Sequence, residues 1–258
     1  MKLQLIRNAT LKLDYAGRTV LIDPYFASKH SQPSFAGRSQ NPLVELPLAI
    51  DKILAGVELV IVSHLHEDHF DEVAMEFVPK HVPIICQPGD EAEIRKTGFT
   101  AVSPLTDIMT WEGLTFTRRE GSHGLGPVLE EMGSVMGFSL EAMGEPSIYW
   151  AGDTVLYPPV ADVIRATSPD IIITHSCAAL WNGDLNVMDA EDTIAVCEIA
   201  PSSLVIATHM EALDHATIGR EELRRAAKAR GIPASRLLIP ADGEVLVMSE
   251  AAFRGPSV

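Results

Sequence analysis

Cysteine and basic residues are scarce in this chain of 258 residues. The three cysteines are few, odd in number and widely spaced, which argues against a disulfide framework and favours a reducing cytoplasm. Only 20 lysines and arginines stand against 35 acidic residues, which gives a net charge of −15 with histidine counted as neutral. This balance argues against a nucleic-acid partner and against docking on an anionic membrane, because both require clustered cations.

Long apolar runs are missing as well. No stretch approaches the roughly 20 apolar residues that a membrane span needs. Residues 1–15 alternate apolar and polar side chains and lack the continuous apolar segment of an export signal. We therefore expect a cytoplasmic protein. The sequence leaves the oligomeric state open, a homo-oligomer included.

The chain does contain many short apolar segments that alternate with helical ones. Residues 10–23 have the pattern of a hairpin, and residues 57–62 are continuously apolar, as in a buried strand. This mixture of hairpins and strand–helix–strand units predicts an α/β fold with mixed sheets. We expect a closing hairpin between residues 236–239 and 244–248. No interdomain linker is evident, so one domain is predicted over residues 1–258.

The residues with the clearest chemistry follow the apolar strand 57–62 directly. His64, His66, Asp68 and His69 place three imidazoles and a carboxylate within six residues, so that they can converge on one point. Neutral imidazole and carboxylate form a ligand set that suits zinc, manganese or iron. A solvated polar loop rarely carries this H-x-H-x-D-H spacing, and we therefore predict a metal site.

This motif after a buried strand resembles the signature of the metallo-β-lactamase superfamily, and later segments match that family in order. His123 lies in a glycine-rich loop, Asp153 lies in an Ala-Gly-Asp-Thr turn, and His209 ends a late strand. The resemblance covers nearly the whole chain. It implies a four-layer αββα sandwich of two mixed sheets flanked by helices. Within that family, the chain resembles the branch of short, single-domain, cytosolic hydrolases that includes the ascorbate-phosphate lactonase.

The resemblance implies two divalent metal ions, with zinc expected first and manganese or iron compatible with the same ligands. One ion would be held by His64, His66 and His123, the other by Asp68, His69 and His209, and Asp153 would bridge them. A metal-bridging hydroxide would then attack a small ester, lactone or phosphoester. Asp68 would be catalytic, by orienting the nucleophile or moving a proton.

Other polar residues are open to two interpretations. His175 ends the predicted strand 170–174 and either supports the metal site or contacts substrate, or it is an ordinary strand-end residue. Asp23 could orient a metal-bound imidazole, or it could simply form the turn before Pro24. His215 competes with His209 as the last ligand. The loops 24–47 and 176–188 could form walls of a substrate pocket. Cys177 and Cys197 are interpreted as core residues.

Alternative functions remain open within this pattern. One alternative is a mononuclear-iron persulfide dioxygenase-like enzyme, whose motif can be similar. Another is a metal-binding regulatory protein with little turnover, which would not be an enzyme of either kind. A secreted β-lactamase is disfavoured because no export signal is found. An oxygen-reducing di-iron protein would have glutamate in place of His66, and a nuclease would need a basic binding surface.

Overall fold

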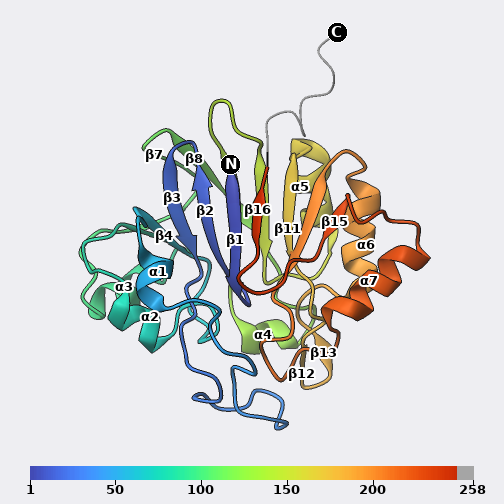
Figure 1. Ribbon diagram of the computed structural model, residues 1–258, viewed down its shortest axis with the longest axis horizontal. Coiled ribbons are helices and arrows are strands. Elements are labelled where there is room, and N and C mark those ends of the chain that lie inside the picture. The colour runs from blue at the N-terminus through green and yellow to red at the C-terminus, as the bar shows by residue number, and fades with distance from the viewer. Residues whose placement is uncertain (249–258) are drawn as a thin grey trace.

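The computed structural model describes residues 1–248, and it has two β-sheets at its centre between two layers of helices (Figure 1). The first sheet contains seven strands in the order β16-β1-β2-β3-β4-β5-β6. Strands β1 to β3 are antiparallel, and β3 to β6 run parallel. The strands are β1 Lys2–Arg7, β2 Thr10–Tyr15, β3 Arg18–Ile22, β4 Leu59–Val62, β5 Ile84–Cys86, β6 Val102–Pro104 and β16 Val245–Val247. The helices beside this sheet are α1 Ile50–Leu54, α2 Glu72–Phe77 and α3 Glu91–Lys96.

The second sheet also contains seven strands, in the order β15-β14-β11-β10-β9-β8-β7. Strands β10, β11, β14 and β15 are parallel, whereas β7 to β10 form an antiparallel meander. The strands are β7 Ile108–Trp111, β8 Leu114–Glu120, β9 Met136–Glu141, β10 Ile148–Gly152, β11 Ile171–His175, β14 Leu204–Thr208 and β15 Leu237–Leu238. The helices beside it are α5 Pro158–Thr167, α6 Ala190–Ile199 and α7 Arg220–Ala229. Among residues 1–248, no helix is both long and apolar enough to cross a membrane.

A large apolar core lies between the two sheets. It includes Leu5 and Leu13 from the first sheet and Phe138 and Trp150 from the second, all of them buried. The rings of Phe138 and Trp150 are stacked, with centroids 5.9 Å apart. Two further apolar clusters lie on the outer sides of the sheets, where the helices pack. These three cores between four layers confirm the predicted αββα sandwich.

The composition of β4 explains where the H-x-H-x-D-H motif lies. All four residues of β4 are buried, because the strand lies between two parallel neighbours in a sheet whose faces are both covered. The next residues of the chain emerge at the carboxyl end of this strand, where ligands bind in open α/β sheets. The loop 24–47 leaves the same edge, because β3 runs parallel to β4.

The predicted closing hairpin is wrong. Residues 236–239 contribute β15, which pairs parallel with β14 in the second sheet, whereas residues 244–248 contribute β16, which pairs with β1 in the first. The intervening turn crosses from one sheet to the other, and Arg220 holds it by donating to the carbonyl of Pro240 and to the carboxylate of Asp242. The local pattern indicated two strands correctly, but it contains no information about their partners.

Three short elements were not predicted from the sequence: β6, helix α4 Val128–Met132 and the small hairpin of β12 Leu180–Trp181 with β13 Asp184–Leu185. Each is five residues or shorter, so its hydrophobic periodicity is too brief to recognise. Helix α4 and the β12–β13 hairpin lie at the same end of the molecule as the loop 24–47 (Figure 1).

Candidate metal centre

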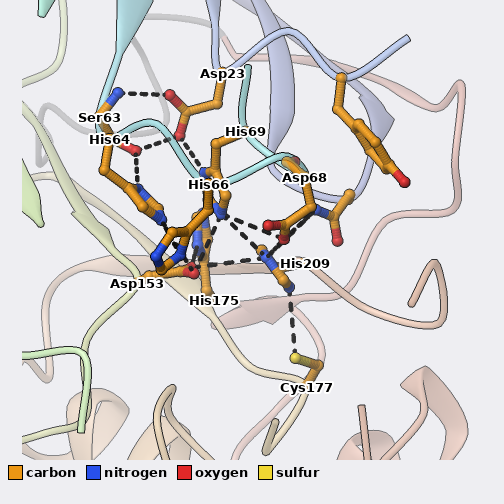
Figure 2. A network of polar contacts seen from close by, with 12 residues as sticks. Asp23, Ser63, His64, His66, Asp68, His69, Asp153, His175, Cys177 and His209 are labelled. Atoms are coloured by element: carbon orange, nitrogen blue, oxygen red, sulfur yellow. Dashed lines mark hydrogen bonds and ion pairs between the residues drawn. The ribbon is translucent and has the colours of Figure 1, made fainter. Parts of the chain in front are cut away.

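The structure brings together all seven predicted ligands, although they come from both sheets. His64, His66, Asp68 and His69 follow β4 of the first sheet, and His123, Asp153 and His209 follow β8, β10 and β14 of the second. Figure 2 labels all of these residues except His123, and their side chains converge there on one small volume. Their metal binding stays a prediction, but the convergence that it requires is present.

Asp153 is at the centre of this cluster. Its Oδ2 lies 3.2 Å from Nε2 of His69, 3.4 Å from Nε2 of His123 and 3.9 Å from Nε2 of His64. Its Oδ1 lies 3.7 Å from Nε2 of His209. One carboxylate therefore faces donor atoms on both sides, which is the position that a bridging ligand requires.

The donor atoms form two groups, each compact enough to hold one ion. His64, His66 and His123 make one group, with their donor atoms within 4.8 Å of one another, as predicted for the first metal. The other group contains His69, Asp153, His175 and His209. His175 therefore lies at the site itself, and its Nδ1 is 2.5 Å from Oδ1 of Asp153. The structure places His209, and not His215, among the ligand candidates.

Asp68 contacts the second group from one side. Its Oδ2 lies 3.0 Å from Nε2 of His209 and 3.6 Å from Nε2 of His69. Asn8, in the turn between β1 and β2, donates to the same oxygen at 3.2 Å and to the backbone carbonyl of Asp68. The sequence analysis missed Asn8, because an asparagine in a turn at positive φ carries no signal of a distant partner.

Asp23 orients two of the imidazoles. Its Oδ2 accepts a hydrogen bond from Nδ1 of His69 at 2.7 Å and from the hydroxyl of Ser63 at 2.6 Å. The Ser63 hydroxyl also lies 3.0 Å from Nδ1 of His64, so Asp23 reaches that ring indirectly (Figure 2). Carboxylates that contact the second nitrogen of a metal-binding imidazole fix its tautomer and orientation. The structure therefore favours the functional interpretation of Asp23 and adds Ser63, which the sequence analysis did not single out.

Cys177 is buried, as predicted for a core residue, but it also contacts a candidate metal ligand. Its Sγ lies 3.5 Å from Nδ1 of His209, on the side of the ring away from the cluster (Figure 2). The interpretation as a core residue was therefore incomplete. Cys197 lies on helix α6 and is buried in the apolar cluster between that helix and the second sheet.

The chemistry of the donor set fits divalent metal ions. Burial holds the pKa of His64 well below its ordinary value, so that ring is neutral and able to bind a metal. Burial opposes the ionisation of Asp153, but His69 and His209 outweigh it and hold its pKa well below the ordinary range. Nε2 of His175 is buried and has no hydrogen-bond partner among residues 1–248. An ionised buried carboxylate beside the neutral imidazole of His64 is a donor pair that suits a divalent metal ion.

A cavity of about 300 Å³ lies over the cluster. Its floor includes His66, Asp68, His123 and Asp153. Loops, helix α4 and the β12–β13 hairpin form its walls, through Phe35, Leu65, Glu131, Met132, Trp181 and His215. Both predicted loops contribute, 24–47 through Phe35 and 176–188 through Trp181.

Asp214 anchors the loop 24–47 beside this cavity. Its carboxylate accepts hydrogen bonds from the backbone N–H groups of Phe35 at 2.9 Å and Arg38 at 3.1 Å, and from Nδ2 of Asn41 at 3.1 Å. The hydroxyl of Ser34 also donates to it. Burial opposes the ionisation of Asp214, but these hydrogen bonds outweigh it and lower its pKa. The folded loop therefore favours the ionised carboxylate.

We expect Asp214→Ala to release this loop. Amide hydrogen exchange over residues 34–39 should become at least about tenfold faster, because the exposed loop loses the acceptor that its N–H groups share. Asp51→Ala, at an exposed position on α1, serves as the control and should leave that exchange unchanged. In the wild type, the anchoring should be complete above the ordinary aspartate pKa and should fade only as the pH falls through the lower folded-state value. Equal exchange in wild type and variant would contradict this role of Asp214.

The chain is similar to known proteins over nearly its whole length. Residues 18–210 match the family model described as "Beta-lactamase superfamily domain". The chain is 40% identical over 252 residues to "UPF0173 protein YddR" of Bacillus subtilis, which covers 95% of this chain and 98% of that protein. A crystal structure of a "possible metal-dependent hydrolase" from Veillonella parvula superposes with a TM-score of 0.92 at 34% identity, covering 96% of this chain and 99% of that one. The structure of "isothiocyanate hydrolase from Delia radicum gut bacteria" superposes with a TM-score of 0.91 at 36% identity and the same coverage.

Proposed function

Because the chain belongs to the beta-lactamase superfamily and, within it, to the UPF0173 metal-dependent hydrolases, we propose that it uses two metal ions to hydrolyse a small uncharged substrate at an electrophilic carbon. The substrate class is an isothiocyanate, a carboxylic ester or a lactone. The observation that carries this proposal is that two ligand groups meet at Asp153 below a cavity that no lysine or arginine of residues 1–248 lines.

The charge of the cavity favours a neutral substrate. Among the described residues, no lysine or arginine lines the inner cavity, whereas Glu67, Asp68, Glu131 and Asp153 all do. Enzymes that transfer phosphoryl groups stabilise the charged phosphate oxygens with arginine, lysine or metal ions. Here the two proposed ions alone would balance that charge, and we rank phosphoesters below uncharged substrates.

Isothiocyanates rank first among these, because of the 36% identity to a structure described as an isothiocyanate hydrolase. The group R–N=C=S is small and uncharged, and its central carbon is electrophilic. Water adds to that carbon to give a thiocarbamate, which breaks down to the amine R–NH₂ and carbonyl sulfide. The cavity of about 300 Å³ is large enough for such a group with a short substituent.

The residues of the chain divide the work. His64, His66 and His123 would hold one ion, and His69, His209 and Asp68 the other, with Asp153 between them. When bound, the metals supply Lewis-acid activation of water and of the substrate. Asp68 lies at the cavity floor, where its Oδ2 is 3.0 Å from Nε2 of His209. From there its carboxylate would orient the attacking water and accept its proton.

A substrate panel with controlled metal content tests the proposal. The purified protein is stripped with a chelator, reloaded with zinc, manganese or iron, and assayed with methyl isothiocyanate, phenyl acetate, a γ-lactone and bis(p-nitrophenyl) phosphate. We expect about two metals per chain and turnover of an uncharged substrate. Preferential hydrolysis of the phosphodiester would refute the uncharged-substrate proposal. One iron per chain with persulfide oxidation would identify a dioxygenase-like enzyme, and fully loaded protein without any turnover would favour a regulatory role.

A further inference from the structure

We propose that a second pocket, beside the metal-site cavity, binds an apolar arm of the substrate. The proposal rests on the proposed function, since it assumes that the reacting carbon lies over Asp68 and Asp153. The second pocket has a volume of about 430 Å³ and is called the outer pocket below. Besides the residues it shares with the inner cavity, its walls include Ala36, Arg38 and Leu180.

The two pockets are neighbours that share three lining residues. Phe35, Trp181 and His215 line both the inner cavity and the outer pocket. Phe35 comes from the loop 24–47, Trp181 ends β12, and His215 lies in the segment between β14 and α7. A molecule that reaches from the metal cluster into the outer pocket therefore passes between two aromatic side chains and an imidazole.

Polar contacts hold both aromatic rings in place. Nε1 of Trp181 donates to Oε2 of Glu131 at 2.6 Å, which fastens the β12–β13 hairpin to helix α4. The backbone of Phe35 is fixed by Asp214, and its ring packs edge-on against His215 with centroids 5.3 Å apart. Both aromatic side chains stay partly exposed to the pockets. A ring whose position is fixed costs little conformational entropy when a ligand packs on it.

The character of the walls changes from the inner cavity to the outer pocket. The inner cavity is lined by four carboxylates, whereas the outer pocket has none among residues 1–248. Its walls combine the two aromatic rings, Leu180 and Ala36 with the polar residues Asn182, Thr217 and His215, and Arg38 is its one cation among those residues. One nitrogen of the Arg38 guanidinium donates to the carbonyl of Ala216, which holds this group at the wall. The two aromatic rings, Leu180 and Ala36 offer an apolar surface on which an alkyl or aryl arm can pack.

A homologous series of substrates measures this preference. The values of kcat/KM are compared for methyl, butyl, hexyl and benzyl isothiocyanates, or for the matching acyl esters if esters are the class that turns over. We expect kcat/KM to rise by up to roughly fourfold for each added methylene that is buried. Trp181→Ala and Phe35→Ala should each reduce the hexyl-to-methyl ratio by about tenfold. Trp181→Phe should retain most of the ratio, because it keeps an aromatic face.

A matched control and a binding measurement keep this test separate from the test of hydrolysis. Phe77→Ala removes an exposed phenylalanine on α2, away from both pockets, and should leave the ratio unchanged.

Binding of N-methylurea and N-hexylurea, which are not hydrolysed, is measured by calorimetry on wild type and Trp181→Ala. If hexylurea binds more tightly and loses that advantage in the variant, the outer pocket is supported even without any turnover. Three results would contradict the proposal that the outer pocket binds an apolar arm. They are equal binding of the two ureas, a hexyl-to-methyl ratio that is unchanged in both alanine variants, and a preference for 6-isothiocyanatohexanoate that depends on Arg38.

Discussion

Replacing His66 by alanine should leave a folded protein that binds fewer metal ions and hydrolyses its substrate at least about 100-fold more slowly. Removing a residue that only supports a metal ligand reduces activity by about 10–100-fold, and removing a ligand itself should have at least the larger of these effects. His66 is the best ligand to remove, because it is the one partly exposed histidine of its group, so its loss creates no large buried cavity. Its Nδ1 lies 3.0 Å from Nε2 of His64, inside the candidate site. The measurements are metal content per chain and kcat/KM with the metal in excess.

The matched control for this variant is His81→Ala, which removes an exposed histidine that follows helix α2. It should bind the full complement of metal and keep wild-type activity. Wild-type metal content and activity in His66→Ala would mean that the H-x-H-x-D-H motif does not hold the catalytic ions, and the proposed mechanism would then be wrong.

Asp23→Asn should weaken metal binding by about 10–100-fold while leaving every ligand in the chain. One oxygen of Asp23 accepts hydrogen bonds from both His69 and Ser63, and the other accepts the backbone N–H of Ser63. An asparagine has a single acceptor oxygen, so its amide N–H₂ must face at least one of these donors. The imidazole of His69 would then lose the partner that fixes its tautomer. Competition with a chelator of known affinity measures the change.

Two further variants show whether the effect passes through the imidazoles. Ser63→Ala breaks only the link to His64 and should weaken binding less than Asp23→Asn does. Asp14→Asn changes a partly exposed aspartate on β2 and should have no effect on metal affinity. If Asp23→Asn binds metal as tightly as wild type, Asp23 forms the turn before Pro24 and does not support the metal site.

The sequence predicted the parts of the site that are local or lie at the end of a recognisable strand. His64 to His69 are contiguous, so their convergence needs only one strand end, and Asp153 and His209 each follow a strand in the order that the family resemblance implies. Asn8 could not be found in this way, because its contact with Asp68 joins residues 60 positions apart through a hairpin turn. The sequence also provided no information about the order of the strands in each sheet. For this reason the prediction of a closing hairpin within residues 236–248 was wrong.

His175 illustrates the same limit at the site itself. Both His175 and His209 end buried parallel strands, and the two strands are neighbours in register, with His175 opposite Thr208. Periodicity treats the two histidines alike, although only one fits the family pattern. The contact of His175 with Asp153 depends on the turn after β10, which packs the aspartate against it. Side-chain direction in such turns is set by tertiary packing, which a single sequence does not describe.

The origin of the ligands from two different sheets has a mechanical consequence. Four of the seven predicted ligands follow the first sheet and three follow the second, so each bound ion would join the two halves of the molecule much as a disulfide joins two segments. The halves could then separate only if the ion is released, and unfolding becomes thermodynamically linked to the concentration of free metal. The melting temperature should therefore rise with added metal and fall with chelator, even for a protein whose core could fold without any ion.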